Sequence, residues 1–86
     1  MKVRYHKQFQ KQVIKLQPAQ LERLQAALQL FQTEPSHPSL YNHPLAGDWQ
    51  GHRSIAFGGY GQAHYKVVPD DIALFVAVGK HSQLYS

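Results

Sequence analysis

Histidines and basic residues are the side chains of this chain that could perform chemistry. From position 43 onward they include His43, His52, Arg53, His64, Lys66 and His81. Cleavage of an RNA phosphodiester without a metal requires a base for the 2′-hydroxyl proton, an acid for the leaving oxygen, and cations that stabilise the charged phosphorane. Histidine, arginine and lysine together can fill all three roles. These residue types favour a nuclease, and surface or structural histidines are the ordinary alternative.

A metal site is the other chemistry that histidines offer. Zinc ligands usually occur in short paired spacings, whereas these histidines are far apart in the sequence. The chain has no cysteine, and the nearby carboxylates are Asp48, Asp70 and Asp71. The glycines at positions 58, 59 and 61 match neither a P-loop nor a dinucleotide fingerprint. The sequence therefore predicts neither a metal site nor a cofactor.

The elements that must position these residues begin with a helical hairpin. Lys2 to Tyr5 is a strand candidate, and apolar residues at helical spacing then predict a first helix from Lys7 to Leu16. Pro18 suits the first turn of a second helix, because its missing N–H has no partner there. The apolar face of the second helix consists of Leu21, Leu24, Leu28 and Phe31.

The rest of the chain predicts a loop followed by strands. Prolines and glycines between Gln32 and Gly51 indicate a long loop, and from Arg53 onward the hydrophobic period changes to two. The predicted strands are Arg53 to Phe57, His64 to Val68 and Ile72 to Val78, the last apolar on both faces like a central strand. The expected fold is α+β in the order β-α-α-β-β-β, with the helical hairpin packed on one face of a small, mainly antiparallel sheet.

Length and charge narrow the class of protein. The 86 residues are expected to form one domain, 1–86, with a single small core. Nine Lys and Arg against five Asp and Glu give a formal charge of +4, which favours an acidic or polyanionic partner. The absence of cysteine fits a reducing compartment, and no apolar run approaches the ~18 residues that span a bilayer. We therefore expect a cytoplasmic protein without a membrane partner.

Three lysines recur every four residues near the start of the chain. Lys7, Lys11 and Lys15 are expected along one side of the first helix. A soluble helix needs a polar side, so a solvated face accounts for them. The alternative is a surface that binds phosphates or an acidic partner peptide. The sequence leaves both interpretations open.

An ordered set of short motifs runs from residue 42 to residue 85. It consists of Asn42-His43-Pro44-Leu45, Gly47, Trp49, Gly51, Arg53, His64-Tyr65-Lys66 and Gly79-x-His81-x-x-Leu84-Tyr85. This set resembles the pattern of the YafQ-like branch of the RelE/ParE superfamily of bacterial toxins. The resemblance implies a small basic ribonuclease of a type II toxin–antitoxin pair, which enters the ribosomal A site, cuts translated mRNA and is neutralised by an antitoxin.

The resemblance also implies roles for single residues. His81 would be the acid that protonates the leaving 5′ oxygen, His43 would assist it, and Arg53 would hold phosphate. Tyr85 would stack on or orient the nucleotide. Lys66, together with the lysines at positions 7, 11 and 15, completes the expected RNA-binding set.

Three of these side chains also have ordinary structural interpretations. His64 is expected to be structural or to lie on the surface, and the sequence does not tell which face of the sheet carries it. Trp49 is expected to cap the edge of the small core rather than stack on a base. Tyr85 can alternatively anchor the end of the chain.

The chain departs from the family pattern in the strand and hairpin after Arg53. Ala56 stands where relatives commonly carry a histidine or a basic residue, and Tyr60-Gly61 stands where they carry Asp-Trp. Catalysis could thus be weak, moved onto His52 or His64, or lost. Three functions remain: a metal-independent endoribonuclease toxin, a non-enzymatic ParE-like toxin that binds DNA gyrase, and a binding module whose nuclease chemistry has decayed.

Overall fold

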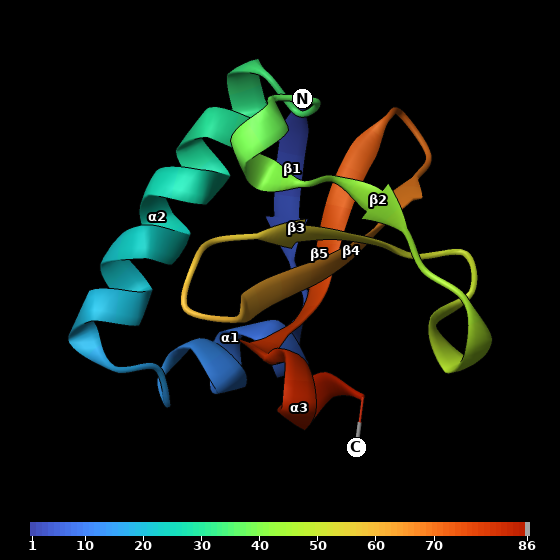
Figure 1. Ribbon diagram of the computed structural model, residues 1–86. Helices are drawn as coiled ribbons and strands as arrows, with labels where there is room; N and C mark the ends of the chain where they lie inside the picture. Colours follow the sequence, from blue (N-terminus) through green and yellow to red (C-terminus); the bar gives the residue numbers. More distant parts are fainter. Residues whose placement is uncertain (86) are drawn as a thin grey trace.

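The computed structural model describes residues 1–85, which form a five-stranded mixed sheet with two helices on one face and a short helix at one end (Figure 1). The helices are α1 (Lys7–Val13), α2 (Pro18–Thr33) and α3 (His81–Leu84). The strands are β1 (Lys2–Tyr5), β2 (His43–Pro44), β3 (Arg53–Ala56), β4 (Gly61–Val68) and β5 (Ile72–Lys80). Two 3₁₀ turns, Pro38–Leu40 and Gly47–Trp49, lie between α2 and β3. The predicted α+β fold, with a helical hairpin packed on a sheet, is confirmed.

The strands are ordered β1-β5-β4-β3-β2 across the sheet. β5 lies between β1 and β4, in agreement with its prediction as an interior strand. It pairs in parallel with β1 and antiparallel with β4, and the other neighbours in the sheet are antiparallel. The first and last strands therefore lie side by side although they come from opposite parts of the chain (Figure 1).

The helix-covered face of the sheet carries the hydrophobic core. Phe31 of α2 packs edge-on against Tyr65 of β4 and Phe75 of β5, with ring centroids 5.0 and 5.4 Å apart. Phe9 of α1 joins the same cluster, 5.8 Å from Phe75. All four side chains are buried. Burial of each such side chain stabilises the fold by about 1.5–3 kcal/mol, so this face is the main source of stability.

α1 ends at Val13, three residues earlier than predicted. Pro18 favours an extended backbone in the residue before it, and Gln17 has φ −66° and ψ 153°. The chain tightens before that point, because the N–H of Lys15 bonds to a carbonyl three residues back. Lys15 therefore lies beyond the helix and not on one helical stripe with the two earlier lysines.

The predicted order lacks two short elements that the structure contains. β2 lies in the segment predicted as a long loop and pairs with β3, where His43 is opposite Ser54. α3 follows β5 directly, and its first N–H, from His81, donates to the Tyr60 carbonyl at 2.9 Å. Elements of two and four residues are too short to show a hydrophobic period.

The longest helix, α2, has 16 residues. Among residues 1–85, no helix combines the length and the apolar composition required to cross a membrane.

Candidate active site

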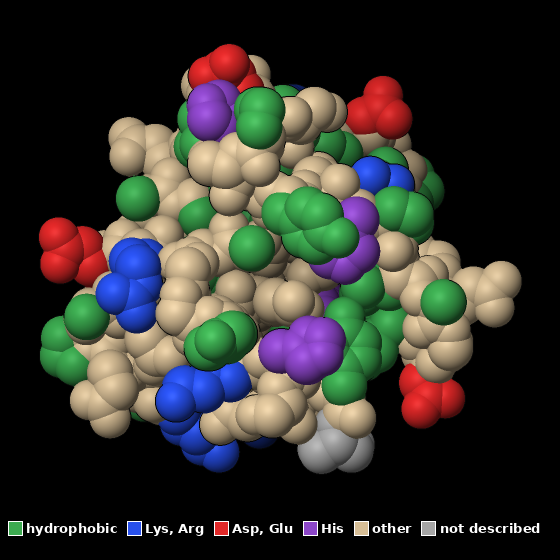
Figure 2. Space-filling model, in the orientation of Figure 1, with side chains coloured by type: hydrophobic (Ala, Val, Ile, Leu, Met, Phe, Trp, Pro, Cys, Tyr) green, Lys and Arg blue, Asp and Glu red, His purple; other side chains and the backbone are tan. Residues whose placement is uncertain are grey.

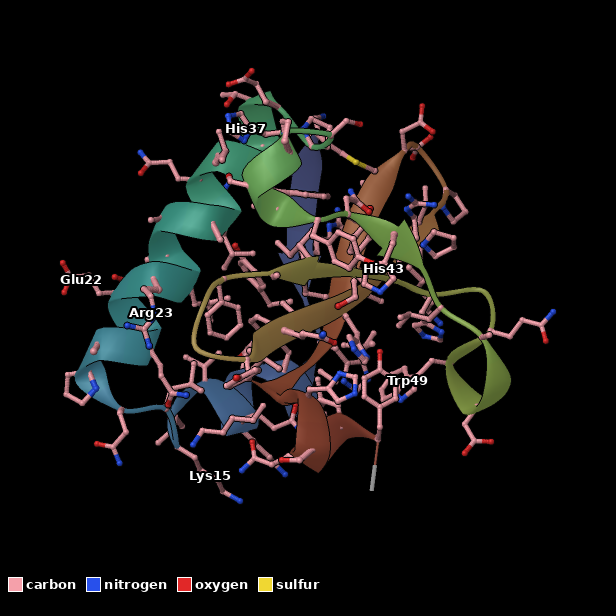
Figure 3. The ribbon with its side chains drawn as sticks, in the orientation of Figure 1. Lys15, Glu22, Arg23, His37, His43 and Trp49 are labelled. Carbon is pink, nitrogen blue, oxygen red and sulfur yellow. The ribbon has the colours of Figure 1, made fainter. Side chains whose placement is uncertain are left out.

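A row of polar side chains lies on the sheet face opposite the helices. His43 of β2, Ser54 of β3 and His64 of β4 are successive partners across the strands. Ile55 and Tyr65, the residues next to Ser54 and His64, belong to the helix-covered core. Because side chains alternate along a strand, the row points away from the helices. The segment that carries Trp49 lies on the same side of the molecule as His43 (Figure 3).

His64 is fully buried in this face. Trp49 packs edge-on against its ring at 4.5 Å between centroids, and the Tyr85 hydroxyl lies 3.2 Å from its Nε2. Burial, followed by the charges of the other three histidines of this face, lowers the pKa of His64 to about 4. The imidazole is therefore neutral at pH 7. His64 was expected to have a structural role or to lie on the surface. Because its side chain is buried, the prediction of a surface residue is wrong.

Gln62 connects His64 to His81, the first residue of α3. Its amide nitrogen lies 3.3 Å from Nδ1 of His81, and its amide oxygen lies 3.4 Å from Nε2 of His64. The same oxygen accepts from the Ser54 hydroxyl at 3.4 Å. The Tyr85 ring packs against the His81 ring with centroids 4.4 Å apart. With Nδ1 occupied, Nε2 of this exposed histidine is the nitrogen that can exchange a proton with a substrate.

His43 is oriented by a different kind of partner. Its Nδ1 lies 2.8 Å from the carbonyl oxygen of Tyr41, and its ring packs on the Tyr41 ring at 4.6 Å between centroids. A carbonyl can only accept, so Nδ1 carries the proton in this contact. Nε2 of the neutral His43 imidazole is consequently a proton acceptor.

Trp49 contacts two of the histidines of this face, and the face forms no metal-binding cluster among the described residues. Trp49 packs against both His52 and His64, at 5.3 and 4.5 Å between ring centroids. The Nδ1 atoms of these two histidines are buried without a hydrogen-bond partner among the described residues. Within residues 1–85, no group of three or more His, Cys, Asp or Glu side chains is arranged to hold a metal ion.

Arg53 lies apart from the histidine face, the side of the sheet that carries His43, Ser54 and His64. It is the cross-strand partner of Tyr65 and therefore shares the side of the sheet that faces the helices. Its Nε donates to Oδ1 of Asn42 at 2.9 Å, and the Asn42 amide also exchanges hydrogen bonds with the Tyr65 hydroxyl. Of the predicted catalytic residues, the structure brings His81 and His43 to the face around His64 and leaves Arg53 outside it.

The lysines of the predicted RNA-binding set are distributed over several surfaces. Lys7 and Lys11 are exposed on α1, and Lys66 is exposed on β4. Lys15 lines a cavity together with Lys80, at the end of β5. Figure 2 shows Lys and Arg side chains close to histidines on the face that is turned to the viewer.

Both departures from the family pattern lie around the β3–β4 hairpin. Tyr60 is 85 % exposed and has a left-handed backbone with φ 63°. A Cβ at Gly61 would come within 2.4 Å of the Phe57 ring, so only glycine fits there without a shift of that ring. Ala56 is the cross-strand partner of Gln62.

Two residues of this face have positions that the sequence analysis did not identify. Gln62 precedes His64 by two positions on an alternating strand, and this spacing alone would have placed both on one face. Trp49 does not cap the helix-covered core. Its indole N–H donates to the Leu84 carbonyl at 3.2 Å, so it joins its loop to α3 across the histidine face. No local sequence signal predicts that contact.

Known proteins share this arrangement of elements. The family described as the ParE toxin of type II toxin–antitoxin system, parDE, matches residues 3–85. No curated protein sequence matches the chain.

Several solved structures are similar over almost the whole chain. YafQ from E. coli strain BL21(DE3) is 24% identical, with 98% of this chain and 97% of that chain aligned at a TM-score of 0.81. The E. coli DinJ–YafQ toxin–antitoxin complex contains a chain that is 26% identical, with 98% and 96% aligned at a TM-score of 0.78. HP0894 from Helicobacter pylori is 27% identical, with 99% of both chains aligned at a TM-score of 0.71.

Proposed function

This chain belongs to the ParE toxin family of type II toxin–antitoxin systems, a toxin of the RelE/ParE superfamily, and on that premise we propose that it is an endoribonuclease that cuts mRNA on the ribosome. The proposed chemistry uses histidines and no metal. The observation that carries this proposal is the pair His43 and His81, whose Nδ1 atoms are both occupied so that each can use Nε2 for proton transfer.

The reaction consists of one in-line displacement at phosphorus. Nε2 of neutral His43 takes the 2′-hydroxyl proton, and the 2′ oxygen attacks the adjacent phosphorus. The bond from phosphorus to the 5′ oxygen breaks, and Nε2 of protonated His81 gives its proton to that oxygen. The products are a 2′,3′-cyclic phosphate and a free 5′-hydroxyl. In the structure the Gln62 NH₂ faces His81 Nδ1 and suits the neutral imidazole with its proton on Nε2. The protonated His81 that acts as the acid carries a proton on Nδ1, so the Gln62 amide rotates to accept from it.

Other residues would bind the substrate. Tyr85 is partly exposed and packs on His81, a position suited to stacking on a base. Lys66 and the exposed lysines of α1 would attract the RNA backbone. Arg53 is assigned a smaller part than the resemblance implies, because its Nε is engaged with Asn42 on the other side of the sheet.

An antitoxin protein is the proposed regulator. The related toxin YafQ forms a complex with DinJ, and the basic charge of the present chain suits an acidic segment of a cognate antitoxin. Ribosomes and mRNA as targets imply a cytoplasmic site of action.

A non-enzymatic toxin that binds DNA gyrase is the second candidate. The description of the matched family names the ParE toxin, and Tyr60-Gly61 stands where relatives carry Asp-Trp, so the hairpin lacks the expected carboxylate. A binding module with decayed chemistry would share these features. Neither candidate requires an imidazole at position 81, which makes that residue the decisive one.

The test is cleavage of ribosome-bound mRNA by wild type, His81→Ala and a control, His37→Asn. His37 is a half-buried histidine that caps a 3₁₀ turn through Ser39, far from the histidine face (Figure 3), and asparagine retains a capping group. We expect His81→Ala to lower cleavage by about 10²–10⁴-fold with an unchanged circular dichroism spectrum, while the control keeps wild-type activity.

Two results would overturn this proposal. One is undiminished toxicity and cleavage in a folded His81→Ala variant, which would favour gyrase binding. The other is wild-type cleavage that strictly requires a divalent metal, tested with a chelator at a level that leaves the ribosome intact.

A further inference from the structure

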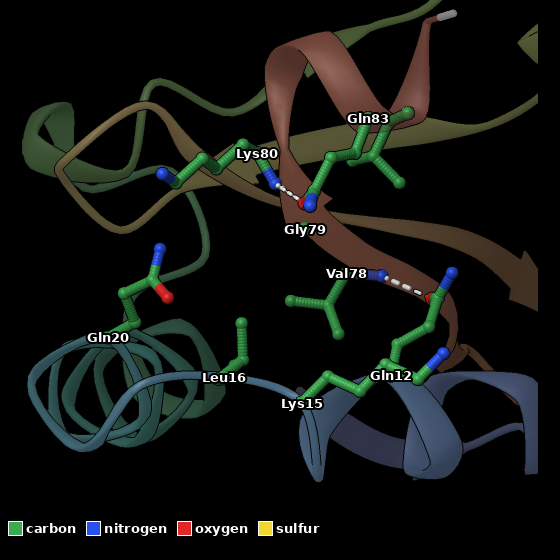
Figure 4. A pocket seen from close by; sticks show the side chains of 9 residues that line it. Gln12, Lys15, Leu16, Gln20, Val78, Gly79, Lys80 and Gln83 are labelled. Atoms are coloured by element: carbon green, nitrogen blue, oxygen red, sulfur yellow. Dashed lines mark hydrogen bonds between the residues drawn. The ribbon is translucent and has the colours of Figure 1, made fainter.

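A cavity of about 250 Å³ lies between the turn that joins α1 to α2 and the junction of β5 with α3. Figure 4 shows it from close by, with glutamine and lysine side chains around it. Its lining residues are Gln12, Lys15, Leu16, Gln20, Val78, Gly79, Lys80, Gln83 and Leu84. None of these described lining residues is acidic.

The glutamine amides of this cavity are oriented by backbone N–H groups. Each uses its oxygen as the acceptor: Gln12 for Val78 N–H at 2.9 Å, Gln20 for Gln17 N–H at 3.2 Å, and Gln83 for Lys80 N–H at 2.8 Å. A backbone N–H can only donate, so it must meet the amide oxygen and not the NH₂ group. The orientation of the amides is therefore fixed, and their acceptor ends are already engaged.

The cavity consequently offers donors and positive charge. The NH₂ groups of Gln12 and Gln20 stand beside the ammonium-bearing side chains of Lys15 and Lys80, with the acceptor oxygens turned to the backbone. Charge-assisted hydrogen bonds from such groups are strongest with an anion that has several oxygens. A cation would meet two lysines and amide oxygens that already accept backbone hydrogen bonds, and an apolar ligand would leave the amide and ammonium donors without partners. The chemistry selects an oxyanion.

Gly79 also lines the cavity and, because it has no side chain, leaves room for the Gln83 amide. A Cβ at this position would lie 2.9 Å from Oε1 of Gln83, too close for the amide to keep its bond to the Lys80 N–H. The Gly79-Lys80-His81 sequence therefore serves two surfaces of α3. Gln83 and Leu84 face the cavity, whereas His81 and Tyr85 belong to the histidine face.

We propose that this donor cavity binds a phosphodiester of the substrate RNA close to the bond that is cut. The inference rests on the proposed nuclease function. Lys80 lines the cavity and is the immediate chain neighbour of His81, so one single strand crossing the start of α3 would reach both surfaces. A phosphodiester has two non-bridging oxygens, which can accept hydrogen bonds from donors that line the cavity. The cavity would fix the register of the strand so that the adjacent phosphate meets Nε2 of His81.

The sharpest variant is Gln12→Glu. A carboxylate still accepts from the Val78 N–H, so the local fold is retained, but the NH₂ donor is replaced by a negative oxygen. The matched control is Gln8→Glu, which makes the same change of charge at an exposed position of α1 outside the cavity. The probe is a short single-stranded RNA with a 2′-deoxy substitution at the cleavage position, so binding is measured without cleavage.

We expect Gln12→Glu to weaken RNA binding by about 10–100-fold, the loss typical of a charge-assisted hydrogen bond, and Gln8→Glu to change it by less than about twofold. The double variant Lys15→Gln with Lys80→Gln should reduce the slope of log affinity against log salt by about 0.7 per lost phosphate contact. On cleavable RNA, Gln12→Glu should raise KM more than it lowers kcat.

RNA affinity of Gln12→Glu equal to that of Gln8→Glu would overturn the inference, and so would a loss confined to binding of the antitoxin. These outcomes are distinct from failure of the proposed function. If wild type binds the RNA probe through the cavity but never cleaves RNA, the nuclease proposal fails and the anion site stands. If wild type cleaves RNA and the cavity variants bind like the control, the nuclease stands and the cavity inference fails.

Discussion

The helix-covered face of the sheet is closed by phenylalanines, leucines and a tyrosine, whereas the opposite face is closed by histidines, a tryptophan and a second tyrosine. On the first face, Phe31 and Phe75 are fully buried among apolar neighbours. On the second, His64 is equally buried, yet its Nδ1 has no partner among the described residues. A buried polar atom without a partner costs about 1–3 kcal/mol. Burial of His64 on the second face therefore lowers the free energy of unfolding, and apolar burial on the first face has to offset that loss.

The same strands serve both faces. In β4, Ala63 and Tyr65 enter the core, while Gln62 and His64 enter the histidine face. Neighbours in the sequence thus have separate tasks. Substitutions on the two faces should change unfolding and RNA cleavage to different degrees, and the following variants test that division.

The largest expected effect is on the helix-covered face. Phe31→Ala removes a buried ring that contacts Tyr65 and Phe75. We expect the free energy of unfolding to fall by about 3–5 kcal/mol, because a cavity remains where the ring was. Urea denaturation at neutral pH measures it, with exposed Tyr60→Ala as the control expected within about 0.5 kcal/mol of wild type. A loss below about 1 kcal/mol would show that this face is not the source of stability.

The next effect belongs to the histidine face and depends on pH. The pKa of His64 is about 4 in the folded protein, below the ordinary 6.5 of the unfolded chain, and the groups facing it are His43, His52, His81 and the Tyr85 hydroxyl. The unfolded state therefore binds the proton first. The contribution of His64 to stability is complete above about pH 6.5 and is lost as the pH falls toward 4.

We expect this loss to amount to about 2 kcal/mol after solvent screening in so small a domain. Urea denaturation of wild type and His64→Leu at pH 7 and pH 4.5 provides the measurement. Leucine has no proton to bind, so the variant should lose less stability between the two pH values. An equal pH dependence in both proteins would mean that His64 does not set it.

A smaller effect is expected at Gln62, which lies on the histidine face next to the core residue Ala63. Gln62→Leu removes the hydrogen-bond partner of His81 Nδ1 and of His64 Nε2. We expect kcat for RNA cleavage to fall about tenfold, equivalent to one net hydrogen bond, with KM nearly unchanged. The free energy of unfolding should fall by about 1–3 kcal/mol, because the buried Ser54 hydroxyl loses its hydrogen-bond partner. The pH profile of kcat should also shift, because the amide no longer supports either state of His81. A change in KM alone would indicate a role in binding instead of positioning.

The smallest effect concerns the lysines that belong to neither face. Replacing Lys7 and Lys11 by Gln should leave stability within about 0.5 kcal/mol of wild type. If they contact RNA, the salt dependence of binding should flatten by up to about 0.7–0.9 log units per lost contact. If they bind the antitoxin, protection by the antitoxin should be lost while toxicity remains. No change in either assay would leave them as a solvated face of α1.

Hydrophobic periodicity was sufficient to predict the scaffold. The apolar face of α2 and the two-residue alternation of β3 and β4 follow from local spacing, and both are present. The shift of the α1 terminus to Val13 depends on where the chain tightens ahead of Pro18, a detail finer than the hydrophobic period. β2 forms by pairing with β3, and α3 begins with a hydrogen bond to the Tyr60 carbonyl. Neither contact produces a hydrophobic period in the short element itself, so local spacing does not predict them.

The candidate site was predictable only in part. The histidines could be identified by type, and two of the three predicted catalytic residues, His43 and His81, lie around His64. Arg53 was grouped with His81 because of a family pattern, whereas strand alternation puts it on the other face with Tyr65. The donor cavity could not be predicted, since it depends on the Gln12 amide, which the distant Val78 N–H orients, and on the approach of the α1–α2 turn to the junction of β5 with α3.

The parallel pairing of β1 with β5 has a consequence for synthesis of the protein. Tyr5 is opposite Phe75, so the first strand to leave the ribosome waits for a partner that is translated after most of the described chain. At about 5–20 residues per second, that delay lasts several seconds. Contacts between such distant segments also close slowly, because the loop must be ordered before they form. His81 and Tyr85 are made later still, so a nascent chain cannot assemble the histidine face while β5 is unfinished.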